Sequence, residues 1–102
     1  MKRLKHKNPH MRKVKNTHPL LVSCNFCKTS LLVYQKGGKG NLIKLQIPRV
    51  IDSNFPLYPL ENALVCYQCE EQMGSLTEYR GNPTYYLARG AVNTKRLTHY
   101  KF

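Results

Sequence analysis

Cys24-Asn25-Phe26-Cys27 and Cys66-Tyr67-Gln68-Cys69 are two Cys-x-x-Cys stretches that together contain all four cysteines of this 102-residue chain. Two residues between the cysteines allow the backbone to turn tightly, so that both sulfurs face one ion at about 2.3 Å. Four thiolates complete a tetrahedron and leave no open position for water or substrate, as in a structural zinc site. We therefore predict that Cys24, Cys27, Cys66 and Cys69 bind one structural Zn²⁺ ion.

Other uses of these cysteines are open at this level. Two disulfides would suit a secreted protein, but we expect no signal peptide here and the composition is very basic. A redox pair would need a Cys-x-x-Cys at the start of a helix, whereas Leu31-Leu32-Val33-Tyr34 after the first pair is typical of a strand. An iron–sulfur cluster or another soft metal is compatible with four thiolates.

The length and patterning predict one small, mainly β domain stabilised by its metal. We expect a basic arm over residues 1–19, disordered or bound to RNA, a zinc-ribbon domain over residues 20–92, and a basic aromatic tail over residues 93–102. No apolar run approaches the roughly 20 residues that a helix needs to span a bilayer, so we predict no membrane partner.

Charge is the second strong signal in the sequence. The formal net charge is +12, seven of the 17 lysines and arginines lie in residues 1–20, and all five acids lie in residues 52–78. Such an excess destabilises a compact domain by self-repulsion unless a polyanion neutralises it. We therefore predict RNA as the partner. A merely soluble basic surface, attraction to a membrane surface, and a targeting peptide at the N-terminus are the alternatives.

A glycine-rich turn, residues 36–41, adds a second feature for phosphate contact. Glycines let backbone N–H groups approach a phosphate closely, although the turn lacks the pattern of a nucleotide-binding P-loop and also fits an ordinary flexible hairpin tip. The bases that we predict to contact RNA are Lys2, Arg3, Lys5, Lys7, Arg12, Lys13, Lys15, Lys36, Lys39, Lys44, Arg89, Lys95, Arg96 and Lys101.

Two hairpins are predicted from alternation and turn residues. The first joins residues 31–35 to residues 42–47 across the glycine-rich turn, with Ile43, Leu45 and Ile47 on one face. The second joins residues 75–79 to residues 84–89. Two Cys-x-x-Cys knuckles, each followed by a hairpin and sharing one metal, correspond to the plan of a zinc ribbon.

Seven tyrosines are present among the bases. Neighbouring residues of a strand face opposite sides, so one of Tyr85 and Tyr86 should be exposed and able to stack on an unpaired base, while the other is buried. Tyr79, Tyr100 and Phe102 lie among bases near the C-terminus, which is also typical of base stacking.

An enzyme is not expected. Binding of all four cysteines to metal leaves no free thiol nucleophile, and the zinc-deaminase pattern is missing because Val65 stands where its proline would be. Glu70 and Glu71 are more simply read as a solvated face than as an acid–base pair. We therefore predict no catalytic residue and no small-molecule substrate.

The stretch from Cys24 to Ile51, with residues 34–45 (YQKGGKGNLIKL), resembles zinc-bearing ribosomal proteins of a eukaryotic organellar zinc-ribbon family. The resemblance implies an accessory component of a mitochondrial ribosome that contacts rRNA and neighbouring ribosomal proteins. Another organelle or the cytosol is the alternative location. The alternative function is a transcription-associated zinc ribbon that binds polymerase or DNA, but the expected hairpin tips lack the acidic pair of elongation-factor ribbons.

Overall fold

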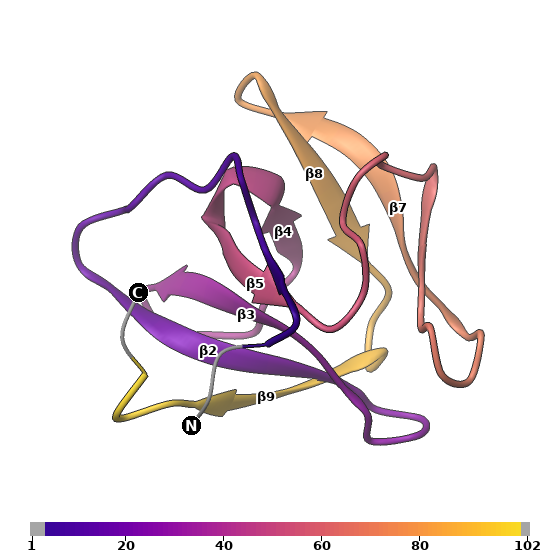
Figure 1. The fold of residues 1–102 in the computed structure, drawn as a ribbon. Helices are drawn as coiled ribbons and strands as arrows, with labels where there is room; N and C mark the ends of the chain where they lie inside the picture. Colours follow the sequence, from indigo (N-terminus) through magenta and orange to yellow (C-terminus); the bar gives the residue numbers. More distant parts are fainter. Residues whose placement is uncertain (1–3, 101–102) are drawn as a thin grey trace.

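The computed structural model describes residues 4–100, and within that range it contains strands and one short 3₁₀ helix but no α-helix. The elements are β1 (His6–Lys7), β2 (Thr17–Cys24), β3 (Ser30–Gly37), β4 (Lys44–Gln46), η1 (Ile47–Arg49), β5 (Val50–Ser53), β6 (Ala63–Val65), β7 (Gln72–Tyr79), β8 (Asn82–Leu87) and β9 (Val92–Arg96) (Figure 1). The prediction of a small, mainly β fold is confirmed.

The strands form two antiparallel sheets. The first has the order β1-β5-β3-β2-β9, and the second has the order β4-β8-β7-β6. Because β9 pairs with β2 from Leu20↔Arg96 to Cys24↔Val92, the last strand completes the sheet that the first strands begin. The second sheet is therefore built by chain segments that lie between β3 and β9 in the sequence.

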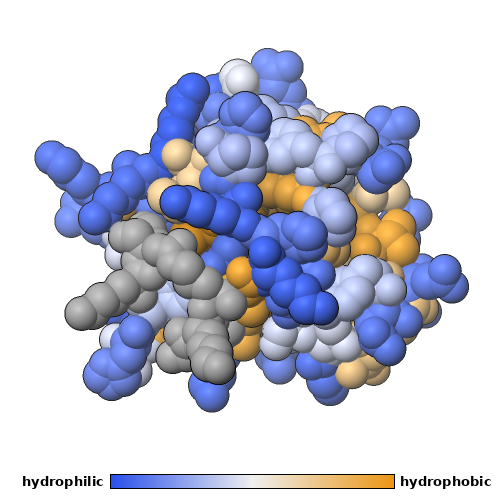
Figure 2. All heavy atoms as spheres, viewed as in Figure 1, coloured by the Kyte–Doolittle hydropathy of each residue, from blue (hydrophilic) through white to orange (hydrophobic). Residues whose placement is uncertain are grey.

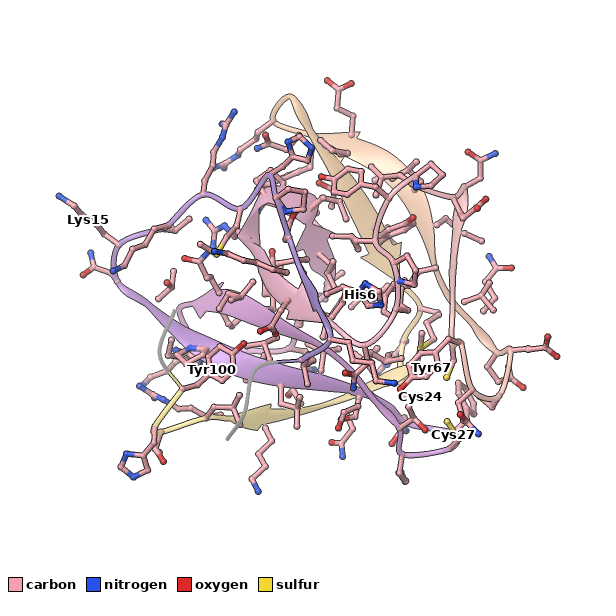
Figure 3. All side chains as sticks on the ribbon, in the orientation of Figure 1. His6, Lys15, Cys24, Cys27, Tyr67 and Tyr100 are labelled. Carbon is pink, nitrogen blue, oxygen red and sulfur yellow. The ribbon has the colours of Figure 1, made fainter. Side chains whose placement is uncertain are left out.

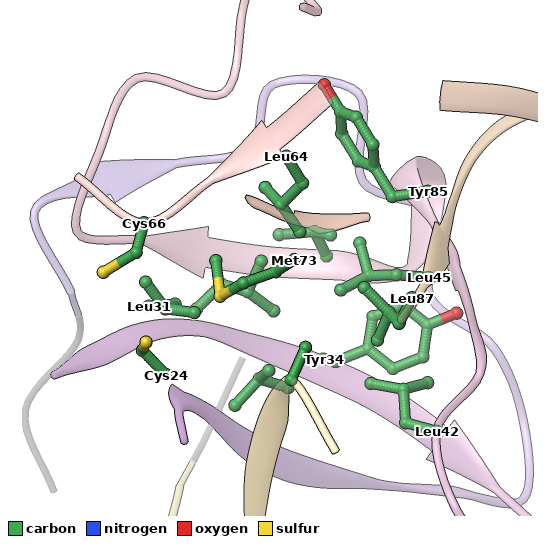
Figure 4. Close-up of a cluster of buried hydrophobic side chains, with 14 of the residues drawn as sticks. Cys24, Leu31, Tyr34, Leu42, Leu45, Leu64, Cys66, Met73, Tyr85 and Leu87 are labelled. Atoms are coloured by element: carbon green, nitrogen blue, oxygen red, sulfur yellow. The ribbon is translucent and has the colours of Figure 1, made fainter. Parts of the chain in front are cut away.

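The main core fills the space between the two sheets. The five-stranded sheet contributes side chains such as Leu31 and Tyr34, and the four-stranded sheet contributes Leu45, Met73 and Leu87 (Figure 4). Burial of such apolar side chains is the main favourable term in folding, at about 1.5–3 kcal/mol for each fully buried one. Cys24 and Cys66 belong to this core, so one cysteine of each Cys-x-x-Cys stretch lies in the layer that joins the sheets.

A second, smaller cluster covers the opposite face of the five-stranded sheet. Val33, Ile51 and Tyr100 are buried in it, and the partly buried side chains of Leu4, Met11, Leu21 and Leu97 pack against them. The apolar residues of the two terminal segments are sparse in the sequence, but they meet on one surface. Both terminal segments therefore act as a cover for this sheet.

Hydrogen bonds hold the N-terminal segment in place. The buried side-chain amide of Asn8 donates to the carbonyl oxygens of Ile47 (2.9 Å) and Val50 (2.8 Å). The Gln35 side chain donates to the Arg12 carbonyl and accepts from the Val14 amide, both at 2.8 Å. These contacts satisfy polar groups that would otherwise be costly to bury.

The expected domain boundaries are corrected by these contacts. Residues 4–19 were expected to lie outside the folded domain, but β1 pairs with β5 and β2 begins at Thr17. Residues 93–96 belong to β9 rather than to a tail. The expected division at residues 19 and 92 fails because long-range pairing and sparse apolar contacts leave no periodic signal in these segments.

The first predicted hairpin is wrong and the second is confirmed. The β3 strand pairs with β2 and β5, while β4 pairs with β8, so the glycine-rich turn connects two sheets rather than two paired strands. Ile43 precedes β4, whose pairing starts at Lys44, and is 50% exposed, whereas Leu45 and Ile47 are buried. In the second hairpin, β7 and β8 pair from Gly74↔Leu87 to Tyr79↔Asn82.

Within residues 4–100, no helix combines the length and the apolar composition that a membrane crossing requires.

Candidate metal centre

Each Cys-x-x-Cys stretch forms the turn of a hairpin, and the two hairpins belong to different sheets. The first knuckle, residues 24–27, joins β2 to β3, and the second knuckle, residues 66–69, joins β6 to β7. Cys24, Cys27 and Tyr67 lie close together at one side of the molecule (Figure 3). The knuckles were expected to precede hairpins; they are instead the turns within them.

The two knuckles share one backbone geometry. The amide of Lys28 donates to the Cys24 carbonyl at 2.8 Å, and the amide of Glu70 donates to the Cys66 carbonyl at 2.9 Å. Lys28 and Glu70 both have φ of 66°, in the left-handed region that non-glycine residues rarely adopt. The residue after the second cysteine therefore reverses the chain in each knuckle and turns both sulfurs to the same side.

The four sulfurs have the spacing of a metal site. All lie within 4.8 Å of one another, and the pairs Cys24–Cys69 and Cys27–Cys66 are each separated by 3.6 Å. A tetrahedron with zinc–sulfur distances of about 2.3 Å has edges of roughly 3.8 Å. A disulfide would need about 2.05 Å, and the four cysteines are free. The set therefore fits one metal ion such as zinc, held by one pair from each sheet.

The surroundings of Cys27 and Cys69 shift the pKa values of these two thiols in opposite directions. Hydrogen bonds from the side chain and backbone of Thr29 lower the pKa of Cys27 to about 6. The backbone hydrogen bond from Glu71 acts to lower the pKa of Cys69, but burial and the three neighbouring cysteines raise it to about 12. The amide of Gln68 also lies 3.4 Å from the Cys66 sulfur. These surroundings therefore favour the thiolate form at Cys27 and the protonated thiol at Cys69.

The first knuckle is also tied to the connection between β8 and β9. The amide of Asn25 donates to the Ala91 carbonyl at 3.0 Å, and its side-chain amide donates to the Gly90 carbonyl at 2.9 Å. The ammonium group of Lys28 donates to the side-chain oxygen of Asn25 at 2.9 Å. These contacts link the metal centre to the start of the last strand of the five-stranded sheet.

The predicted RNA-binding bases do not form one continuous cluster. Lys36 pairs with His18 across β2 and β3, and Arg96 lies near the same imidazole. Burial, followed by the positive charges of Arg96 and Lys36, lowers the pKa of His18. Exposed bases also line the N-terminal segment and the edge strand β9: Lys5, Lys7, Arg12, Lys13, Lys15 and Lys95. Lys2, Arg3, Lys101 and Phe102 lie outside the described residues.

Three predicted bases lie elsewhere. Lys44 is on the four-stranded sheet, with its ammonium nitrogen 4.2 Å from the centre of the Tyr79 ring. Lys39 is exposed in the connection between β3 and β4, and Arg89 is exposed in the connection between β8 and β9. His18 lies opposite Lys36 in the register of β2 and β3, a position that depends on strand pairing and is not visible in the spacing of the bases along the sequence.

The acidic side chains are segregated from the five-stranded sheet. Among the described residues, the exposed acids are Glu61, Glu70, Glu71 and Glu78, all around β6 and β7, whereas Asp52 of β5 is buried. The strands of the five-stranded sheet and the segment before β2 therefore expose bases without an exposed carboxylate. Hydrophilic side chains dominate the face drawn in Figure 2, with smaller hydrophobic areas between them.

The prediction that one of Tyr85 and Tyr86 is buried and the other exposed is confirmed. Tyr85 is 3% exposed and its hydroxyl donates to the Glu61 carbonyl at 2.7 Å, whereas Tyr86 is 54% exposed.

Comparison of the chain with protein-family models, with curated proteins and with solved structures finds no match. The function is therefore inferred from the chemistry of these residues.

Proposed function

We propose that this protein is a non-enzymatic RNA-binding protein whose two sheets are joined by one structural zinc ion. Cys24, Cys27, Cys66 and Cys69 hold the ion, and their hairpins constitute a zinc ribbon. The donor set supports this assignment, because two pairs of thiols from two sheets converge with sulfur–sulfur distances close to a tetrahedral edge. When bound, zinc supplies a rigid cross-link between the sheets.

The segregation of charge is the observation that carries RNA binding. Within residues 4–100, the five-stranded sheet and its N-terminal cover expose bases but no carboxylate, and the exposed acids gather around β6 and β7. A surface of this kind concentrates phosphates and releases condensed counterions when it binds them. Contacts of lysine and arginine with phosphate position a protein without reading sequence. We therefore propose that the exposed bases of the N-terminal cover and of the five-stranded sheet contact the RNA backbone.

The proposed assembly is a ribosome, in mitochondria, where the protein contacts rRNA and neighbouring ribosomal proteins. The support for this step is the resemblance of residues 24–51 to zinc-bearing organellar ribosomal proteins, together with the net charge of +12. A role inside a large RNA–protein particle also suits a small domain with a wide basic surface and little acid to repel phosphate.

Fractionation of cell extract tests the ribosomal assignment. The endogenous protein should sediment with a ribosomal subunit of mitochondria at physiological salt, and crosslinking should recover rRNA fragments. Migration as a free protein at that salt, or crosslinks confined to DNA and polymerase, would refute the ribosomal proposal. The second of these outcomes would favour the transcription-associated alternative.

Binding measurements with purified protein test the basic surface. Replacing Lys36 and Arg96 with Gln should weaken binding to RNA and reduce the slope of affinity against salt by about one for each lost phosphate contact. Arg80→Gln removes one positive charge outside the five-stranded sheet and is the control, because Arg80 lies at the turn between β7 and β8 and faces Tyr79. Equal loss in both variants would contradict the placement of RNA on the five-stranded sheet.

A further inference from the structure

Tyr86 is a large aromatic residue left open in the middle of a sheet. It pairs with Lys44 of β4 on one side and with Ser75 of β7 on the other, so the three side chains share the outer face of the four-stranded sheet. Tyr86 is 54% exposed, whereas its neighbour Tyr85 faces the core. None of the described elements covers this ring, which is therefore available for stacking.

Two cavities flank the segment from Tyr86 to Arg89. The larger has a volume of about 580 Å³ and is bordered by Ile43 of the β3–β4 connection and by Thr94 of β9. The smaller has a volume of about 370 Å³ and is bordered by Gln72 and Ser75 of β7. Both lie within the roughly 300–1,000 Å³ of small-molecule sites. Residues 86–89 thus form a ridge between two hollows.

The charges around this ridge match a phosphate backbone. Arg89 borders both cavities, Lys44 is the strand partner of Tyr86 and places its ammonium group over the nearby Tyr79 ring, and none of the described residues that line either cavity is acidic. Asn41 and Thr94 add an amide and a hydroxyl to the wall of the larger cavity. An aromatic ring with adjacent bases is the composition of sites for single-stranded nucleic acid, where bases stack and phosphates pair with cations.

We propose that the Tyr86 ridge binds unpaired RNA nucleotides, with one base stacked on the Tyr86 ring and the adjoining phosphates contacting Arg89 and Lys44. This inference rests on the proposed RNA-binding function and adds to it a site for single strands. In a duplex the bases stack on one another, so their faces are not accessible for stacking on the Tyr86 ring. The ridge therefore discriminates single strands from duplexes, whereas the basic five-stranded sheet does not.

Fluorescence anisotropy of a labelled oligouridine of about 12 nucleotides, and of the corresponding duplex, tests this site with the full-length zinc-loaded protein. Tyr86→Ala should weaken binding of the single strand by roughly 5- to 150-fold and leave duplex binding unchanged, because one stacking contact is lost. Tyr86→Phe should retain single-strand binding because its ring can still stack. Thr77→Ala is the matched control, because Thr77 is exposed on β7 and borders neither cavity.

The two proposals fail in different ways. If wild-type protein binds both oligonucleotides but Tyr86→Ala binds the single strand normally, the ridge proposal is wrong and the basic surface stands. If wild-type protein binds neither oligonucleotide, RNA binding itself is refuted. If Tyr86→Ala weakens the binding of an acidic peptide of equal charge as much as it weakens the binding of the single strand, the ridge is a protein-binding surface and the proposal is overturned. Thermal melting of each variant verifies that the fold is intact.

Discussion

The hydroxyl of Tyr100 donates a hydrogen bond to the carboxylate of Asp52, 48 positions earlier in the chain. The same carboxylate oxygen accepts the backbone amide of Leu4 at 3.3 Å. Asp52 is buried in β5, so the segments before β1 and after β9 meet at one interior charge. Hydrogen bonds to a charged group contribute about 1.5–3 kcal/mol, more than neutral ones.

Tyr100→Phe should lower the free energy of unfolding by about 1.5–3 kcal/mol, because the buried carboxylate loses a donor while the ring remains. Denaturant titration measures this loss, and hydrogen exchange at the Leu4 amide should accelerate. Tyr86→Phe removes the hydroxyl of an exposed tyrosine and is the control, with little change expected. Equal stability of the two variants would show that the Tyr100–Asp52 bond contributes nothing.

Gly74→Ala should destabilise the protein by about 1–3 kcal/mol. A Cβ at residue 74 would lie 2.8 Å from the Tyr86 carbonyl oxygen, which is backbone of the paired strand and has little freedom to move. Gly37→Ala is the matched control, since its Cβ would lie 3.6 Å from the Thr17 methyl group, an ordinary contact. Thermal unfolding of the two variants measures the difference in stability. Equal melting temperatures for Gly74→Ala and Gly37→Ala would contradict the close pairing of β7 and β8.

Features that depend on local chemistry or on alternation along a strand are predictable from the sequence. Four cysteines at fixed spacing predicted the cluster, and the alternation of Tyr85 and Tyr86 predicted one buried and one exposed ring. Features that depend on non-local pairing are not predictable in this way. Strand β4 pairs with β8, about 40 residues further along the chain, instead of with β3. The cover formed by residues such as Leu4 and Leu97 depends on isolated apolar side chains that have no period.

Glu70→Gly should raise the free energy of unfolding by about 0.5–1 kcal/mol, because Glu70 has a φ of 66° that glycine adopts without strain. Glu71→Gly is a control of identical charge change. Glu71 has no positive φ, so glycine there should cost about 0.5–1 kcal/mol through added freedom of the unfolded chain. Denaturant titrations should therefore show changes in the free energy of unfolding of opposite sign for the two variants. A loss of stability in both variants would contradict the positive φ at Glu70 in the second knuckle.

Cys66→Ser should abolish stoichiometric zinc binding and reduce stability by at least about 3 kcal/mol, lowering Tm by roughly 12 °C or more. Metal analysis and calorimetry measure both effects. Removal of zinc from wild-type protein with a chelator should give a similar shift. Met73→Leu alters the same core without touching a thiol and should retain one zinc, with a cost below about 1.5 kcal/mol. Unchanged zinc content in Cys66→Ser would exclude a four-thiolate site.

His18 should couple RNA binding to pH. Its pKa is lowered by burial, Arg96 and Lys36, so the folded state binds fewer protons than the unfolded state and stability should fall as pH drops below about 6.5. A phosphate bound at Lys36 and Arg96 would offset their charge and raise the pKa of His18. Proton uptake would then make binding tighter as pH falls below about 6.5.

NMR titration of His18 with and without RNA measures this coupling, and affinity measured against pH gives its size. In His18→Gln the contribution from this residue should disappear, leaving a flatter pH profile. An imidazole pKa that stays constant when saturating RNA is added would place the phosphates away from Lys36 and Arg96.

A metal ion bound by both knuckles would also change the entropy of forming the strand pair between β2 and the edge strand β9. Pairing Cys24 with Val92 closes a loop of about 68 residues in the free chain. Once one ion joins Cys24 to Cys66, the loop that remains is about 26 residues, which lowers the closure entropy cost by roughly 0.8 kcal/mol. An ion at this site would therefore shorten the loop that closes when β9 pairs with β2, and so lower the entropic cost of adding this strand to the sheet.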